Sequence, residues 1–333
     1  METIGVSAIE TPVLFLLGPT ASGKTALATS IVDRFAGKRR IEIVSVDSAL
    51  VYREMNIGTA KPDRRMLADY PHHMIDLIDP AEIYSAADYR RDVLMALEAI
   101  LSRGSVPLMV GGTMMYVKML LEGISSLPPA DPAIRAALAT EAVSVGWPAM
   151  HAKLATVDYI TAARLAPSDS QRIQRALEVF LISGIPMSEH HQRETKQAAG
   201  GAHAKFPYTA HLLALVPSDR AVLHQRIAKR FDEMLKSGFV EEVHHLRERF
   251  NLTADLPSMR AVGYRQVWQF LEGELNDDQF REQAMAATRQ LAKRQLTWLR
   301  SMPDAVTFDC LDHNVSGHVE ARVESIFKAG AES

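Results

Sequence analysis

The sequence predicts an α/β fold in which a parallel sheet flanked by helices is interrupted by an all-helical insertion domain. Two observations support this prediction. Short apolar runs alternate with helical patterns through the first third of the chain, and residues 128–201 then contain helical patterns without a strand-like run. Alternation of strands and helices is typical of a parallel sheet with helices packed on its faces.

The first part of the predicted core covers residues 1–125. Its strands are short, continuous apolar runs, and its helices show apolar residues at a spacing of three and four. The predicted strands are 13–17, 41–46 and 107–110, and the predicted helices are 24–35 and 86–102.

The predicted insertion covers residues 126–206, and the second part of the core covers 207–333. Proline and glycine separate the insertion helices, at Trp147-Pro148, at Pro167 and at 184–186, and the segment 197–205 predicts a flexible connector. The predicted insertion helices are 133–145, 149–154 and 171–182. The core is expected to resume with a strand at 210–216 and helices at 220–237, 239–250 and 276–300.

The composition is that of a globular protein, with 47% hydrophobic and 23% charged residues in 333. It excludes disordered and collagen-like classes, and no apolar stretch is long enough to span a membrane. The single cysteine, Cys310, and an N-terminus without a basic leader predict a cytoplasmic protein. A net charge of −3 excludes a uniformly basic protein but permits a local basic groove. No feature requires more than a monomer.

A P-loop motif follows the first predicted strand and begins the first predicted helix. It satisfies G-x-x-x-x-G-K-[ST] in the context that this motif requires, so the fold class is P-loop NTPase-like. Backbone N–H groups, a lysine and a helix N-terminus would surround phosphate oxygens, and the Thr25 hydroxyl is a candidate ligand of Mg²⁺. The predicted phosphate-binding residues are Gly18, Pro19, Thr20, Ala21, Ser22, Gly23, Lys24 and Thr25.

Two further predicted strands should end beside this loop, because ligands of parallel α/β sheets bind at the carboxyl ends of the strands. Asp47 follows the strand at 41–46, and Thr113 follows Gly111-Gly112. A carboxylate beside a diphosphate can hold a metal ion or remove a proton from a nucleophile. The alternatives are a turn or N-cap role for Asp47 and a helix N-cap role for Thr113.

A basic helix is predicted near the end of the chain, where residues 288–300 contain four basic side chains and no acidic one. Arg289, Lys293 and Arg300 are expected to share a face with Leu296, while Ala287, Leu291 and Trp298 should form the packed face. Such a stripe suits nucleic-acid phosphates, and the alternative is a solvated helix surface. In the insertion, Arg172 or Arg175 could instead pair with Glu178 one turn away.

Seven blocks of sequence, in order, resemble the tRNA dimethylallyltransferase family, also called tRNA isopentenyltransferases. The resemblance covers residues 12–300 and is closest to the bacterial form, because eukaryotic members append a C2H2 finger. The blocks are GPTASGKT (18–25), SVDSALVYREMNIGTAKP (45–62), YSAADYRRD (84–92), VGGTMMYVK (110–118), DSQRIQRALEVF (169–180), MRAVGYRQ (259–266) and TRQLAKRQLTWLR (288–300).

The resemblance implies transfer of the dimethylallyl group from its diphosphate to N6 of adenosine 37 in tRNA, with Mg²⁺ as cofactor. Asp47 would be the general base with Thr113 beside it, and Arg230 would contact the diphosphate. The insertion would bind the anticodon stem-loop. The implied tRNA contacts are Asp47, Ser48, Ala49, Leu50, Thr113, Arg135, Gln171, Arg172, Ile173, Gln174, Arg175, Arg260, Ala261, Val262, Gly263, Tyr264, Arg265, Arg289, Lys293, Arg294, Gln295, Leu296, Thr297, Trp298, Leu299 and Arg300.

Two other functions share part of this residue set. An ATP-dependent kinase of a small metabolite would use the P-loop and Asp47, but it gives no role to a C-terminal basic helix. A P-loop switch protein that binds RNA would hydrolyse or exchange a nucleotide and would leave adenosine unmodified.

Overall fold

The computed structural model describes residues 12–123, 127–199 and 206–330. The chain forms two compact units, the core Met1–Leu121 with Phe206–Ser333 and the insertion Glu122–Lys205. In the described ranges, no helix has the length and apolar character needed to cross a membrane.

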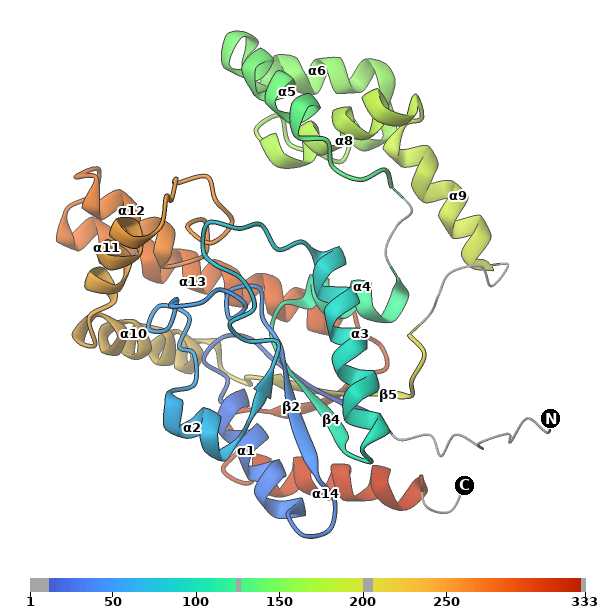
Figure 1. The fold of residues 1–333 in the computed structure, drawn as a ribbon, viewed down its shortest axis with the longest axis vertical. Helices are drawn as coiled ribbons and strands as arrows, with labels where there is room; N and C mark the ends of the chain where they lie inside the picture. The colour runs from blue at the N-terminus through green and yellow to red at the C-terminus, as the bar shows by residue number, and fades with distance from the viewer. Residues whose placement is uncertain (1–11, 124–126, 200–205, 331–333) are drawn as a thin grey trace. The chain divides into compact units, whose positions relative to one another are not determined.

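The core contains a fully parallel sheet of six strands in the order β3-β2-β4-β1-β5-β6 (Figure 1). The strands are β1 (Val13–Leu17), β2 (Ile41–Val46), β3 (His72–His73), β4 (Val106–Gly111), β5 (Ala210–Val216) and β6 (Val306–Asp309). The core helices are α1 (Lys24–Phe35), α2 (Arg64–Asp69), α3 (Ala86–Ser102), α4 (Met114–Glu122), α10 (Arg220–Lys236), α11 (Phe239–Arg249), α12 (Tyr264–Leu271), α13 (Asp277–Arg300) and α14 (Val315–Ala329).

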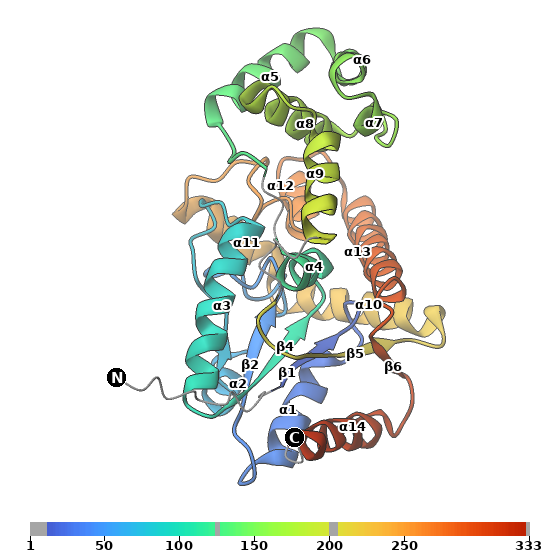
Figure 2. The same cartoon turned by 90° about the vertical axis from the view of Figure 1, so that its right-hand side faces the viewer.

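Alternate residues of β1 face the two helical layers, as the pleat of a strand requires. Phe15 belongs to the cluster formed with α3 and α4, whereas Leu14 and Leu16 pack among the side chains of α1 and α14. Figure 2 shows these two helix pairs on opposite faces of the sheet. All five residues of β1 are fully buried, which explains why this strand is a continuous apolar run.

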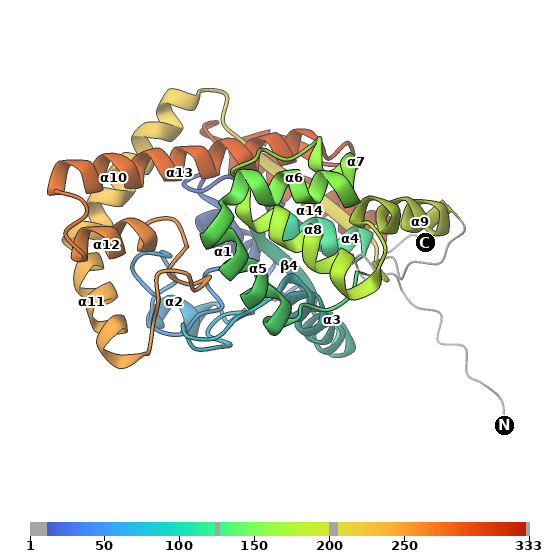
Figure 3. The same ribbon diagram turned by 90° about the horizontal axis from the view of Figure 1, so that it is seen from above.

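Helices α10, α11 and α12 and the first part of α13 gather at one side of the core (Figures 1 and 3). They enclose a separate apolar cluster that includes Phe239 and Tyr264 together with Val51 and Met55, from the segment that follows β2. The segment after β2 is therefore packed against the C-terminal helices rather than against the sheet.

The insertion is helical in its described part. Its helices are α5 (Pro132–Val145), α6 (Trp147–Val157), α7 (Tyr159–Ala162), α8 (Ser170–Ser183) and α9 (Met187–Ala199). Leu138, Met150, Leu154 and Ile173 form its own apolar core. The predicted connector at 197–205 overlaps the end of α9, and its remaining residues lie outside the described part of the chain.

The prediction of a break at Trp147-Pro148 is wrong. These residues begin α6, with proline in the first turn, where a missing N–H leaves no hydrogen bond unmade. Gly146, with φ of 80°, separates α5 from α6. The strand predicted at 107–110 is longer by one residue at each end.

Candidate active site

Three neighbouring strands end in the same row of the sheet. Leu17 of β1 and Val46 of β2 both pair with Gly111 of β4, and the Gly18 N–H donates to the Gly111 carbonyl at 3.3 Å. A Cβ atom on Gly111 would lie 2.1 Å from the Val46 carbonyl oxygen, so only glycine fits this close approach. The P-loop, Asp47 and Gly112 therefore leave the sheet side by side.

The P-loop turns through two left-handed residues, Ala21 with φ of 63° and Gly23 with φ of 86°, before α1 begins at Lys24. The Lys24 ammonium donates to the Pro19 carbonyl at 2.7 Å. Burial, together with the nearby positive charge of Arg230, lowers the pKa of Lys24 to about 8, although Asp47 opposes this shift.

Asp47 interacts electrostatically with two cations from different parts of the chain, Lys24 and Arg230. Its charge raises the pKa values of both Lys24 and Arg230, although burial keeps the pKa of Arg230 below its ordinary value. One Asp47 carboxylate oxygen accepts the Ala49 N–H at 2.8 Å. The turn contact anticipated as the alternative is thus present, and it leaves the second carboxylate oxygen for other partners.

Thr113 stands immediately before α4, and the Tyr116 N–H donates to its carbonyl at 2.9 Å. Its hydroxyl accepts the Ser48 N–H at 3.1 Å. The side chain therefore joins the end of β4 to the segment after β2, next to Asp47.

Gln295 of α13 reaches the P-loop, a role that the sequence analysis did not anticipate. The Thr20 N–H donates to Gln295 Oε1 at 2.9 Å, and Gln295 Nε2 donates to the Gly112 carbonyl at 2.9 Å. The side chain is buried, and a Cβ atom on Gly112 would lie 2.4 Å from its amide nitrogen. The sequence signal that could have revealed this role is the position of Gln295, a polar residue in a helix face that is otherwise apolar.

The predicted orientation of α13 is wrong in part. Leu296 is buried, together with Ala292 and Leu299, because this face packs on α10 and the sheet. Trp298, expected in the packed face, is instead exposed and lies under the Lys118 ammonium at 5.5 Å. The basic residues still lie along one side of the helix: Lys293 and Arg300 are exposed and Arg289 is half-buried, while Arg294 and Thr297 are also exposed.

The segment 260–265, also predicted to contact RNA, contains both exposed and buried residues. Arg260 and Arg265 are exposed, whereas Gly263 and Tyr264 are buried. Ala261 and Val262 are half-buried. The Tyr264 ring is part of the apolar cluster beside α11, so an RNA contact through this side chain is excluded in this conformation.

In the insertion, the buried Glu178 carboxylate binds two of the predicted RNA-contacting arginines. Arg135 Nε lies 2.9 Å and Arg175 Nη1 2.6 Å from it. The pairing anticipated for Arg175 is thus present, whereas Arg172 pairs with Asp169 at 3.5 Å.

The other insertion residues predicted to contact RNA differ in exposure. Gln171 is exposed, and Gln174 is half-buried with its amide donating to the Arg135 carbonyl at 2.9 Å. Ile173 is fully buried in the apolar core of the insertion and cannot contact RNA in this conformation.

The residues at the P-loop suit a magnesium ion that is held mainly by phosphate oxygens. Mg²⁺ in phosphate sites takes one or two protein ligands and completes its shell with phosphate and water. The Thr25 side chain is exposed in the first turn of α1, directly after Lys24, and can supply one oxygen. In the described ranges, no three His, Cys, Asp or Glu side chains form a separate metal cluster.

Comparison with known proteins assigns the family. Residues 50–302 match the family described as IPP transferase, which is well over half of the chain. The chain belongs to this family. IPP transferase relatives named tRNA dimethylallyltransferase include one from Burkholderia multivorans, which is 55% identical over 93% of each chain. Another, from Thiobacillus denitrificans, is 54% identical over 97% of this chain and 98% of the relative.

Solved structures of IPP transferases have the same fold. A tRNA isopentenylpyrophosphate transferase from Bacillus halodurans is 30% identical with a TM-score of 0.68, over 97% of this chain and 98% of that one. The structure of a eukaryotic dimethylallyltransferase acting on tRNA has a TM-score of 0.75 and 24% identity, over 96% of this chain and 80% of that one. At this identity the comparison supports the fold only. The predicted fold class and family resemblance are confirmed.

Proposed function

We propose that this protein transfers the dimethylallyl group from dimethylallyl diphosphate to N6 of adenosine 37 in tRNA. The observation that carries the proposal is the register of β1, β4 and β2, which brings the P-loop, Thr113 and Asp47 into one row. Membership of the IPP transferase family, with relatives named tRNA dimethylallyltransferase, supports this substrate pair over others that a P-loop can bind.

Asp47 acts as the general base in this proposal. The exocyclic amine of adenine is a weak nucleophile, because its lone pair is delocalised into the ring. The N6 nitrogen attacks C1 of the dimethylallyl group, the C–O bond to the diphosphate breaks with its electron pair, and the Asp47 carboxylate takes the N6 proton. A positioned base of this kind contributes about 10²–10⁴-fold to the rate.

The leaving diphosphate is stabilised by groups fixed before the reaction. Lys24 and Arg230 supply positive charge at partly buried positions, where electrostatic interactions are stronger than in water. P-loop N–H groups other than that of Thr20, which donates to Gln295, and the N-terminus of α1 add donors for the phosphates. Thr25 would hold Mg²⁺, and the ion would supply further positive charge to stabilise the leaving group.

The tRNA is bound by exposed cations and by the insertion. Lys293, Arg300, Arg260 and Arg265 are exposed and suit contacts to the RNA backbone. We assign binding of the anticodon stem-loop to the insertion.

Adenosine 37 has to leave its base stack to reach Asp47, which costs a few kcal/mol. We expect the protein to act as a monomer, and we expect the reaction in the cytoplasm, where tRNA is found.

The test is incubation with unmodified tRNA and dimethylallyl diphosphate, followed by mass analysis of the nucleosides. The proposal predicts N6-dimethylallyladenosine and release of diphosphate. In a parallel measurement, dimethylallyl diphosphate should raise the melting temperature more than ATP does, because a ligand stabilises the state that binds it. Protection by ATP alone, with unmodified adenosine, would favour a kinase.

A further inference from the structure

The segment that follows β2 has an unusual backbone. In the described part of the chain, five residues other than glycine have positive φ, and two of them, Glu54 at 63° and Ala60 at 50°, lie in this segment. Two more, Met74 at 64° and Asp76 at 54°, lie in the turn after β3, where the Asp76 N–H donates to the Leu50 carbonyl of the segment. Such conformations cost on the order of 1–3 kcal/mol each and persist only where the surroundings impose them. The contacts that hold this segment therefore matter for the residue at its start, Asp47.

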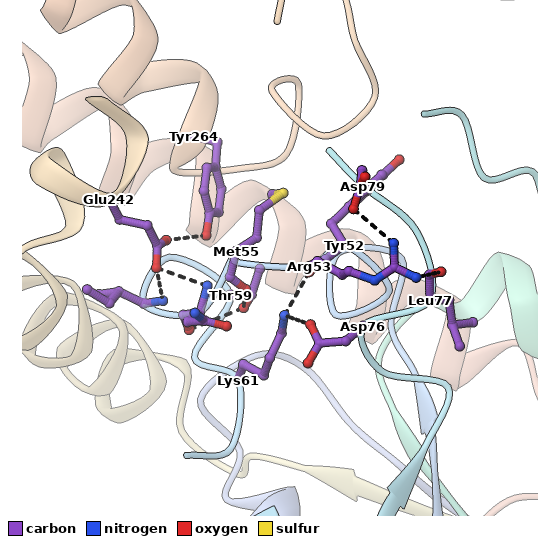
Figure 4. A network of polar contacts seen from close by, with 12 residues as sticks. Tyr52, Arg53, Met55, Thr59, Lys61, Asp76, Leu77, Asp79, Glu242 and Tyr264 are labelled. Carbon is purple, nitrogen blue, oxygen red and sulfur yellow. Dashed lines mark hydrogen bonds and ion pairs between the residues drawn. The ribbon is translucent and has the colours of Figure 1, made fainter. Parts of the chain in front are cut away.

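One carboxylate from α11 holds the segment at its far end. Glu242 Oε2 accepts the N–H groups of Asn56 at 2.9 Å and Ile57 at 2.6 Å, and Oε1 accepts the Gly58 N–H at 3.2 Å. The Tyr264 hydroxyl donates to Oε1 at 2.6 Å (Figure 4). Three convergent amides form a concave site that favours an anion, and here a side chain of the protein fills it.

The packing around this carboxylate leaves little freedom. A Cβ atom on Gly58 would lie 2.0 Å from the Phe239 ring and 2.6 Å from the Tyr264 ring. These two rings meet edge to face with their centroids 5.0 Å apart. The Gly58 backbone thus packs closely against the rings of Phe239 in α11 and Tyr264 in α12. Glu242 holds the same backbone by accepting its N–H.

The anchored turn is connected to the proposed diphosphate site through Thr59. The Thr59 carbonyl accepts from Arg230 Nη2 at 3.5 Å. The Thr59 hydroxyl donates to the Met55 carbonyl at 2.6 Å, which keeps the turn closed. A shift of this turn would move the partner that orients the Arg230 guanidinium.

A second connection runs towards Asp47. The Lys61 N–H donates to the Asn56 carbonyl at 2.9 Å, and the buried Lys61 ammonium donates to the Tyr52 carbonyl at 2.7 Å. Figure 4 shows Lys61 between Tyr52 and Asp76. The Tyr52 N–H in turn donates to the carbonyl of Ala49, the residue whose own N–H donates to Asp47.

We propose that Glu242 is a positioning residue of the prenyl transfer: its carboxylate holds amides 56–58, and so fixes Thr59 against Arg230 and the segment that begins at Asp47. This inference rests on the proposed function. Glu242 touches neither substrate. It acts through the orientation of Arg230 and the placement of Asp47.

The test compares Glu242→Gln with Glu241→Gln in the full chain. Both residues lie in the first turn of α11, so each variant removes the same charge from the same helix end. Only Glu242 contacts amides 56–58, and Glu241 is exposed. Glutamine keeps the shape but turns an NH₂ group towards the amide donors. Glu242→Gln should lower kcat/KM for dimethylallyl diphosphate on the order of 10–100-fold, because small misplacements of catalytic groups are costly.

Two readouts separate positioning from general loss of structure. Hydrogen exchange of the amides at 56–58 should accelerate in Glu242→Gln and not in Glu241→Gln. In an Arg230→Gln background, Glu242→Gln should cost clearly less than in the wild type, because its effect passes in part through Arg230. Equal losses in both backgrounds, or activity equal to that of Glu241→Gln, would overturn the inference.

If Glu242→Gln does not fold, Tyr264→Phe replaces it, since this change removes one donor to the carboxylate and keeps the ring packing. It should give a smaller loss of kcat/KM in the same direction, and an unchanged kcat/KM would again overturn the inference. Absence of any transfer by the wild-type protein would contradict the proposed function instead. Transfer by the wild type with no effect of these variants would contradict only the role of Glu242.

Discussion

The Thr20 N–H donates to the side chain of Gln295, so the phosphate loop at the start of the chain is held by the C-terminal helix α13. The same side chain donates to the Gly112 carbonyl. Gln295→Leu would leave the buried Gly112 carbonyl without this partner, at a cost of about 1–3 kcal/mol, and would remove the acceptor of the half-buried Thr20 N–H. We expect lower stability in chemical denaturation and, on calorimetric titration, about tenfold weaker binding of dimethylallyl diphosphate.

Gln290→Leu is the matched control, because Gln290 is an exposed glutamine on the same helix. It should leave diphosphate binding unchanged. A Gln295→Leu protein that loses stability but binds the diphosphate like the wild type would show that the contact is structural only.

The pKa of Lys24 gives a pH dependence with a defined sign. Its ammonium is charged below about pH 8 and neutral above it, so affinity for the diphosphate should fall as pH rises through about 8. Titrations of the free enzyme from pH 6 to pH 10 measure this. Lys24→Ala should bind weakly at every pH and lack the step. A wild-type affinity that is flat across this range would contradict the role of the lysine.

Stability should change in the opposite direction. The folded-state pKa of Lys24 lies below its ordinary value of 10.5, so between about 8 and 10.5 the unfolded chain binds more protons. The free energy of unfolding therefore gains a contribution that rises with pH in this window. The difference between wild type and Lys24→Ala, measured by denaturation at several pH values, isolates this contribution.

The exposed cations of α13 predict a salt dependence of RNA binding. Replacing Lys293 or Arg300 with alanine should weaken tRNA binding and reduce the slope of log K against log salt by about 1 for each phosphate that is no longer neutralised. Lys328→Ala on α14 removes an equally exposed charge from the opposite face of the sheet and serves as control. If the slope is the same in all three variants, α13 does not contact the RNA backbone.

Glu178 should govern the stability of the insertion. Burial acts to raise its pKa, but hydrogen bonds from Arg175 and Arg135 outweigh this and lower it. Its contribution is therefore complete above the unfolded-state pKa and is lost as pH falls through the lower folded-state value. Glu178→Gln weakens the charge-assisted hydrogen bonds to two partly exposed arginines and should destabilise the insertion by about 1–3 kcal/mol.

Hydrogen exchange of α5 and α8 measures this locally. Glu141→Gln breaks an exposed pair with Lys153 and should cost no more than about 1 kcal/mol. Equal effects of the two substitutions would contradict the structural role of Glu178.

Much of the core could be predicted because its signals are local. The bounds of β1, β2, β5, α1 and α3 agree with the predicted ones. Strand β6 was missed because VTFD is a short edge strand with exposed residues, and its place is set by pairing with β5. The strand β3 has only two residues, too few for any periodicity.

From the sequence, only the part of the site that lies directly after the strands could be predicted. Lys24, Asp47 and Thr113 follow strands whose carboxyl ends share an edge, so their proximity follows from topology. The contacts of Gln295 and Glu242 join residues more than 180 positions apart, and periodicity does not reveal which backbone group a side chain reaches. The face of α13 was misassigned at Leu296 and Trp298 because apolar residues occur on several sides of this helix.

The most direct test of the account is the single-turnover rate of dimethylallyl transfer by Asp47→Asn, followed by mass analysis of the tRNA nucleosides. Asparagine keeps the size of the side chain and cannot take the N6 proton. We predict a rate about 10²–10⁴-fold below that of the wild type, with tRNA and diphosphate affinities preserved. A rate close to that of the wild type would contradict the claim that Asp47 is the base.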